Sequence, residues 1–170
     1  MNYHNITHDD LLNGEGVRVV LWVSGCFHHC YKCQNQQTWN PNSGILFDDN
    51  AKKEIFLDLR KDYITGITFS GGDPLNENNI ATVLSLAKEI KENFPDKTIW
   101  VYSGYTMEEI VADTKGDIIW EQRKDLILNY TDVFCDGRFM EHLLNVNKPW
   151  VGSSNQKVIN IKEWKERNIT

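Results

Sequence analysis

Three of the four cysteines in this 170-residue chain lie in one short segment, as Cys26, Cys30 and Cys33, and the fourth, Cys135, lies far along the chain. Thiolates at this density suit a zinc ion or an iron–sulfur cluster. Each of the four irons of a cubane cluster wants one outside ligand, so three cysteines would leave one iron open. An open iron can bind a substrate or cofactor, whereas a fourth cysteine would make a plain electron-transfer centre.

Other chemistry remains open for this segment. A disulfide is disfavoured in a cytosolic chain, where thiols stay reduced, and a thioredoxin-like dithiol of Cys30 and Cys33 leaves Cys26 without a role. Structural zinc needs a fourth ligand, which His28, His29 or Cys135 would supply. We expect both histidines to be partly exposed loop residues, because closing a shell around one ion from inside the loop is awkward.

Composition places the chain among ordinary globular proteins, with 41% hydrophobic and 25% charged residues. The 18 basic residues against 24 acidic ones give a net charge of −6, which gives no support to a nucleic-acid footprint. The longest apolar run, Val19 to Val23, is far too short to span a membrane, and the first residues lack the pattern of a signal peptide. We therefore expect a cytoplasmic protein without membrane or nucleic-acid partners.

Strands and helices are expected to alternate along a single domain, residues 1–170. Apolar runs predict strands, and residues recurring at three- and four-residue steps predict helices. The expected strands are 17–24, 64–70, 98–103, 132–136 and 157–161. The expected helices are 49–61 with an N-cap at Asp48 or Asp49, 78–94, one that begins at the capping box Thr106-Met107-Glu108-Glu109, and 118–129.

This alternation predicts an α/β fold with a mainly parallel sheet. In such sheets, functional residues gather at the carboxyl ends of the strands. Three chemically suggestive segments follow predicted strands: Gly25–Asn35, Ser70–Pro74 and Ser103–Tyr105. We therefore treat these segments as one site. Cys135 lies inside an apolar predicted strand, and we expect a buried, inert thiol there.

The cysteine spacing is the signature of the radical S-adenosylmethionine superfamily, and further motifs in the right order narrow the resemblance. They are Gly14-Glu15-Gly16-Val17-Arg18, Thr38-Trp39-Asn40, Ser70-Gly71-Gly72-Asp73-Pro74-Leu75, Ser103-Gly104-Tyr105-Thr106, Asp136-Gly137-Arg138-Phe139 and Gly152-Ser153-Ser154-Asn155-Gln156. Together they resemble the activating proteins of anaerobic ribonucleoside-triphosphate reductases, a family of glycyl-radical-enzyme activases. The resemblance runs from about residue 10 to residue 160.

The resemblance implies a fold and a reaction. The fold is a shortened, incomplete (β/α) TIM-like barrel. Cys26, Cys30 and Cys33 would hold three irons of a [4Fe-4S] cluster, and the fourth iron would bind S-adenosyl-L-methionine. Reductive cleavage of that cofactor would yield methionine and a 5′-deoxyadenosyl radical, which abstracts hydrogen from a glycine of the reductase. This is an oxidoreductase activity.

The resemblance also implies which residues bind the cofactor. Gly71, Gly72 and Asp73 would meet its methionyl end, with Asp73 accepting a hydrogen bond from the ammonium group. The remaining cofactor-binding candidates are Lys32, Cys33, Gln34 and Ser103, and no catalytic side chain is implied beyond the cluster and cofactor. For Ser103, a capped strand–helix turn is an equal alternative. For Asp136 and Arg138, lining the site and structural pairing are equally expected.

The resemblance implies two protein partners. One is the anaerobic ribonucleoside-triphosphate reductase as protein substrate, and the other is a low-potential electron donor such as flavodoxin. A homodimer or a complex with the reductase remains open. Two alternative functions also remain: an activase of another glycyl radical enzyme, such as formate lyase, and a non-enzymatic zinc-binding interaction module.

Overall fold

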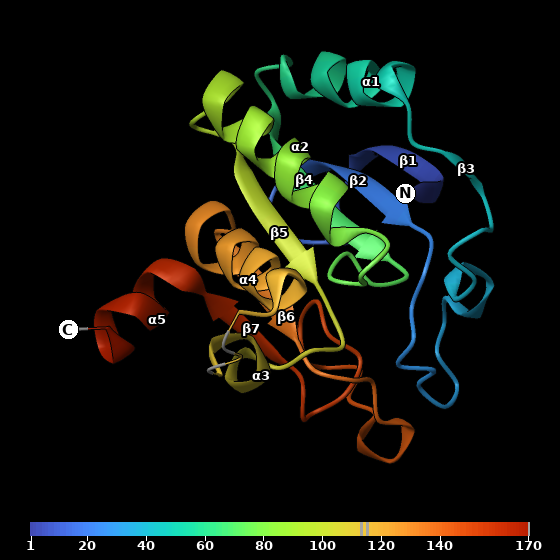
Figure 1. Cartoon of the computed structure of the whole chain (residues 1–170), viewed down its shortest axis with the longest axis vertical. Helices are drawn as coiled ribbons and strands as arrows, with labels where there is room; N and C mark the ends of the chain where they lie inside the picture. The colour runs from blue at the N-terminus through green and yellow to red at the C-terminus, as the bar shows by residue number, and fades with distance from the viewer. Residues whose placement is uncertain (113, 115, 170) are drawn as a thin grey trace.

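Figure 1 shows the computed structural model of the chain, which describes residues 1–112, 114 and 116–169. Its centre is a seven-stranded sheet in the order β3-β1-β2-β4-β5-β6-β7. The strands are β1 (Asn2–Asp10), β2 (Val17–Val23), β3 (Ile45–Leu46), β4 (Ile64–Gly71), β5 (Thr98–Tyr102), β6 (Val133–Asp136) and β7 (Lys157–Asn160). The helices are α1 (Asp49–Leu59), α2 (Ile80–Asn93), α3 (Met107–Val111), α4 (Ile118–Asp125) and α5 (Ile161–Asn168).

The sheet is parallel at its centre and antiparallel towards its edges. β2, β4, β5 and β6 pair in parallel, whereas β1 pairs antiparallel with both β2 and β3, and β7 pairs antiparallel with β6. The α/β class and the parallel centre are therefore confirmed. Across the described residues the sheet is not closed, because β3 and β7 are its two edges, so a TIM-like barrel is not confirmed.

The two faces of the sheet have different chemistry because side chains alternate along each strand. One face packs against α1, α2 and α4, which lie along the same side of the sheet in Figure 1. Its side chains belong to the apolar core, as Leu21, Phe69 and Val101 do. The other face carries polar and aromatic side chains. There Thr68 pairs with Trp100 across β4 and β5, and Tyr102 pairs with Cys135 across β5 and β6.

The helix signals of the sequence identify most helices correctly. Asp48 caps α1 by accepting a hydrogen bond from the Ala51 amide at 2.9 Å. Thr106 forms the expected capping box of α3 with Glu109. The helix expected over 118–129 is α-helical only to Asp125 and then continues as a π-helical turn, Leu126–Tyr130.

Three elements were not expected from the sequence: β1, β3 and α5. β1 is polar, and only Tyr3, Ile6 and Asp10 along it are buried. Two irregularities in its pairing with β2 break the two-residue alternation that would reveal a strand. α5 is a polar helix with one buried residue, Ile161, so its apolar pattern is too weak to predict it.

A buried arginine connects the central strands near their amino ends. Arg18 of β2 is 0% exposed, and burial lowers its pKa to about 10. Its guanidinium donates to the hydroxyls of Thr68 and Thr98, each at 2.9 Å. It also donates to the carbonyls of Ile67, Thr98 and Glu15 at 2.7, 2.9 and 3.0 Å. β2, β4 and β5 are thereby joined through one side chain, and the buried guanidinium has acceptors for its hydrogens.

We predict that Arg18→Met lowers the free energy of unfolding by about 3 kcal/mol, because buried acceptors that lose their donor cost about 1–3 kcal/mol each. Urea denaturation of the purified protein measures this. The control is Arg60→Met at an exposed position, which should change stability by less than about 0.5 kcal/mol. Equal stability of the two variants would contradict the role given to Arg18.

Candidate functional site

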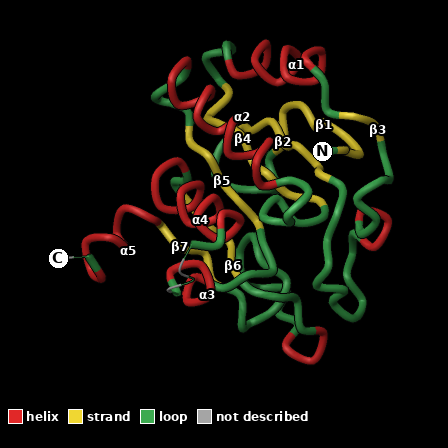
Figure 2. Tube along the Cα trace, in the orientation of Figure 1, coloured by secondary structure: helices red, strands yellow, loops and turns green. Residues whose placement is uncertain are grey.

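Four loops meet where the central strands end, and Figure 2 shows the long loops gathered at that end of the sheet. Backbone hydrogen bonds join the loop after β4 to β2 and the cysteine segment, and the loop after β5 to β6 and the loop that follows it. They run from Gly72 to Val23 (2.8 Å), from Asp73 to Gly25 (2.8 Å), from Ser103 to Cys135 (3.0 Å) and from Gly137 to Tyr105 (3.1 Å). The loops after β4 and β5 are joined by the Asp73 side chain, which accepts from Ser103 Oγ and the Gly104 amide. The expected meeting of Gly25–Asn35, Ser70–Pro74 and Ser103–Tyr105 at one site is confirmed.

The cysteine loop, residues 24–35, follows β2 directly. Cys26, Cys30 and Cys33 are half-buried and free. The Cys33 amide donates to the Cys30 carbonyl at 3.0 Å, closing a tight turn. His29 and Lys32 both have positive φ, at 48° and 56°, a left-handed conformation that is uncommon outside glycine. These turns fold the loop back on itself between Cys26 and Cys33.

The thiols influence one another electrostatically. Burial raises the pKa of Cys26 to about 12, and the negative charges of Asp73, Cys30 and Cys33 contribute, against a lowering by the His28 backbone. The pKa of Cys30 is also raised, chiefly by burial, although a backbone hydrogen bond from Phe139 opposes part of this effect. The Cys33 Sγ accepts a hydrogen bond from the Asn35 amide at 3.3 Å. Sulfur ligands of iron–sulfur clusters commonly accept such backbone hydrogen bonds.

The donor set of three thiolates suits a cubane cluster, in which each thiolate binds a different iron. Among the described residues, no three His, Cys, Asp or Glu side chains form a group around a single point. His28 and His29 differ in environment. His29 is exposed. His28 is partly exposed as a residue, as expected, but its side chain is only 8% exposed.

Gly71 and Gly72 are required by the packing of backbone on backbone. Gly71 has φ +100°, and a Cβ there would lie 2.7 Å from the Val23 nitrogen. A Cβ on Gly72 would lie 2.6 Å from the Gly25 carbonyl oxygen. Both glycines therefore let the loop after β4 lie directly against the end of β2 and the start of the cysteine loop.

Asp73 is buried, with 1% exposure, and its carboxylate joins three loops. Oδ1 accepts a hydrogen bond from the Leu75 amide at 2.8 Å. Oδ2 accepts from His28 Nε2 at 2.6 Å, from Ser103 Oγ at 2.9 Å and from the Gly104 amide at 3.2 Å. Ser103 also accepts from the Tyr105 amide at 3.1 Å, so it caps the turn after β5.

The other cofactor-binding candidates lie on the outer side of the cysteine loop. The Lys32 side chain is 59% exposed and pairs with Glu141 at 2.8 Å. Gln34 is exposed. The Lys32 side chain points to Glu141, in the loop after β6.

Asp136 and Arg138 both make structural pairs. Asp136 is buried and accepts hydrogen bonds from the amides of Met107 (2.8 Å) and Lys157 (3.1 Å), which holds α3 and β7 beside β6. Arg138 pairs with Glu109 at 3.1 Å. Cys135 is 1% exposed, as expected for a buried thiol.

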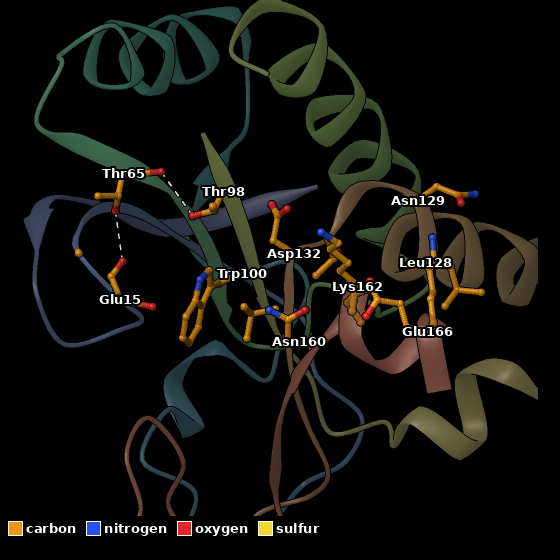
Figure 3. Close-up of a pocket in the computed structure, with 15 residues that line it drawn as sticks. Glu15, Thr65, Thr98, Trp100, Leu128, Asn129, Asp132, Asn160, Lys162 and Glu166 are labelled. Atoms are coloured by element: carbon orange, nitrogen blue, oxygen red, sulfur yellow. Dashed lines mark hydrogen bonds between the residues drawn. The ribbon is translucent and has the colours of Figure 1, made fainter. Parts of the chain in front are cut away.

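A cavity of about 810 Å³ lies at the opposite, amino ends of the central strands (Figure 3). Thr65, Thr98, Trp100 and Val133 form its sheet wall, and Lys162 of α5 lies across from them. Its described lining includes none of the cysteines and none of Gly71–Asp73. This cavity is therefore separate from the cysteine loop.

Comparison with known proteins gives both a matching family and similar full-length relatives. Residues 12–159 match the family described as a 4Fe-4S single cluster domain. An anaerobic ribonucleoside-triphosphate reductase-activating protein of Haemophilus influenzae is 38% identical over 95% of this chain and 99% of its own. Proteins of the same name from Enterobacteria phage T4 and Escherichia coli K12 are 42% and 40% identical, covering 93% and 95% of this chain and 93% and 100% of their own. The chain belongs to this family of activating proteins.

Membership of the activating-protein family supports iron–sulfur chemistry at the cysteine loop, since the matched domain holds one 4Fe-4S cluster and spans that loop. In the described part of the chain, no helix is long and apolar enough to cross a membrane.

Two residues at the site were missed from the sequence. His28 was expected to be a partly exposed loop residue, and its contact with Asp73 joins loop positions that are 45 residues apart in the chain. Asn79, 1% exposed, donates to the carbonyls of Ser24 (2.7 Å) and Asp73 (2.9 Å) and so joins the starts of two loops. In the sequence, an asparagine just before α2 indicates a helix cap. Nothing in the sequence indicates that it also joins two loops.

We predict that Gly72→Ala lowers the free energy of unfolding by about 1–3 kcal/mol, the usual cost of overpacking, because backbone atoms must move to admit the methyl group. Thermal denaturation measures this, with Ser85→Ala on an exposed position of α2 as control. Unchanged stability of Gly72→Ala would contradict the close packing of Gly72 against the Gly25 backbone.

Proposed function

We propose that residues 1–170 act as a single domain that activates an anaerobic ribonucleoside-triphosphate reductase by generating a glycyl radical on it. The observation that carries the proposal is the three-cysteine loop, packed against Gly71–Asp73 at the carboxyl ends of parallel strands, in a chain of the activating-protein family. The class of enzyme proposed is a radical S-adenosylmethionine oxidoreductase.

The cluster ligands in this proposal are Cys26, Cys30 and Cys33. Cys135 is unsuited as a fourth ligand, because it is buried on β6 among the side chains of the sheet. One iron of a cubane is then left for S-adenosyl-L-methionine. When bound, the reduced cluster and this cofactor would supply reductive cleavage of the cofactor and hydrogen abstraction from a glycine.

The role of the chain is to hold and enclose the cofactor beside the cysteines. We assign cofactor contacts to Gly71, Gly72, Asp73 and Ser103 on one side, and to Lys32, Cys33 and Gln34 on the other. Because Asp73 already accepts four hydrogen bonds, its main contribution is to fix the surrounding backbone. The backbone at Lys32–Gln34 makes the contacts on the cysteine loop, because the Lys32 side chain is engaged with Glu141.

The open sheet suits a protein substrate. We propose that it corresponds to an incomplete (β/α) barrel, and that a glycine-bearing segment of the reductase enters through the gap. A macromolecular segment needs a wider opening than a small molecule does. An external low-potential donor, such as flavodoxin, would reduce the cluster. Thiol ligands of this kind persist in a reducing cytoplasm, which is the location we propose.

We predict that Cys30→Ser loses most of the bound iron after anaerobic reconstitution, because serine offers no thiolate, whereas Cys135→Ser retains about the wild-type amount. Iron and sulfide assays of both purified variants measure this. Cluster loss in Cys135→Ser would contradict the three-ligand assignment.

We further predict that the reconstituted protein, reduced with dithionite in the presence of S-adenosyl-L-methionine, forms 5′-deoxyadenosine and a glycyl-type doublet on an added anaerobic ribonucleotide reductase. Electron paramagnetic resonance and product analysis measure the two outcomes. Formate lyase as the added protein is the control for partner choice.

A doublet on formate lyase alone would assign the chain to another glycyl radical enzyme. A colourless protein that contains zinc and makes no 5′-deoxyadenosine would overturn the proposal in favour of a zinc-binding interaction module.

A further inference from the structure

His28 is enclosed although it lies in a loop. Its side chain is 8% exposed, and Nε2 lies 2.6 Å from Asp73 Oδ2. A carboxylate only accepts hydrogen bonds, so the imidazole is the donor. His28 thereby joins the stretch between Cys26 and Cys30 to the loop that follows β4.

The structure provides a fitted space for this imidazole. A Cβ on Gly104 would lie 2.3 Å from His28 Cδ2, so the absence of a side chain at position 104 makes room for the ring. The Tyr105 ring packs edge-on against the imidazole, with centroids 4.6 Å apart and planes at 75°. The loop after β5 therefore holds His28 on two sides, independently of its hydrogen bond to Asp73.

The same carboxylate oxygen ties all three loops. Oδ2 of Asp73 accepts from His28, from the Ser103 hydroxyl and from the Gly104 amide. A buried carboxylate needs such donors to offset its lost hydration. Removing one of them is expected to alter the position of the carboxylate and of the two loops that share it.

Other contacts of the cysteine loop lie at its exposed side or at its start, away from Asp73. The Lys32–Glu141 pair is exposed on the outer side, and such pairs contribute little. The Cys26 amide bonds to the Trp39 carbonyl at 3.0 Å, which holds the start of the loop. Between Cys26 and Cys30, the His29 ring packs against Trp39, with centroids 4.5 Å apart, and the His28 side chain bonds to Asp73.

We propose that His28 is a positioning residue, which fixes the cysteine loop against Gly71–Asp73 through Asp73 Oδ2, so that the cluster ligands and the cofactor-binding loops keep one relative placement. The inference rests on the proposed function, because it concerns the placement of S-adenosyl-L-methionine relative to the cysteines. His28 acts through Asp73 and is not assigned a contact with the reacting atoms.

The test compares three variants after anaerobic reconstitution. His28→Phe keeps a ring beside Tyr105 and removes the donor, and His28→Gln keeps a donor of similar reach. His142→Asn is the control, since His142 is an exposed histidine outside the cysteine loop. The measurements are iron content, the dissociation constant for S-adenosyl-L-methionine by equilibrium dialysis, and the change that this cofactor causes in the paramagnetic spectrum of the reduced cluster.

We expect His28→Phe to retain iron and to bind S-adenosyl-L-methionine about tenfold more weakly, the ratio that corresponds to losing one hydrogen bond to a charged group. Its spectral change on cofactor addition should be reduced. His28→Gln should recover most of both properties, and His142→Asn should match the wild type. Loss of iron from His28→Phe but not from His28→Gln would also support the proposal, because the donor would then hold the cysteine loop itself.

Two further variants separate positioning from a general effect on folding. Gly104→Ala should reproduce the defect of His28→Phe, because its methyl group would occupy the place of the imidazole. Asp73→Asn combined with His28→Phe should bind the cofactor no more weakly than Asp73→Asn alone, because both changes break the same link.

Wild-type affinity and spectrum in His28→Phe, or equal defects in His28→Phe and His28→Gln, would overturn the inference. A wild-type protein that binds neither iron nor S-adenosyl-L-methionine would instead overturn the proposed function. The two failures are therefore distinguishable.

Discussion

The carboxylate of Asp73 is the interaction on which the arrangement of the site depends. It is buried, and its four hydrogen bonds come from the loops after β2, β4 and β5. None of these loops is held at this end by regular secondary structure alone. A charged group that must be satisfied by donors from separate loops imposes one arrangement on all of them, because any other leaves the charge without partners.

The two ends of the sheet have different roles: the amino ends are held together by a buried side chain, and the carboxyl ends carry the candidate site. At the amino ends, the Arg18 guanidinium joins β2, β4 and β5. At the carboxyl ends, the strands give way to loops joined by backbone hydrogen bonds and by Asp73. The first end fixes the spacing of the strands, and the second uses that spacing to bring the cysteines beside the Gly71–Asp73 loop.

The sequence predicts the central strands well because β2 and β5 are largely apolar runs, the pattern of strands buried on both faces. In β4 the apolar residues Ile64, Ile67 and Phe69 are interrupted by threonine and glycine, yet they still indicate a strand. The sequence does not predict β1, whose polar residues and pairing irregularities hide its period. The three cysteines are evident from spacing alone, but His28 is not. Its burial depends on a glycine 76 positions further along the chain, and the sequence carries no local sign of that fit. The structure also changes the interpretation of Gly71 and Gly72, since backbone packing on β2 already requires them.

The fit between Gly104 and His28 has an evolutionary consequence. The imidazole occupies the volume that any side chain at position 104 would need, so the two positions are not free to vary one at a time. A larger residue at 104 is compatible with the site only alongside a smaller residue at 28, and the link to Asp73 would then have to come from elsewhere. The pair should therefore covary among distant relatives, even though 76 positions separate it in the chain.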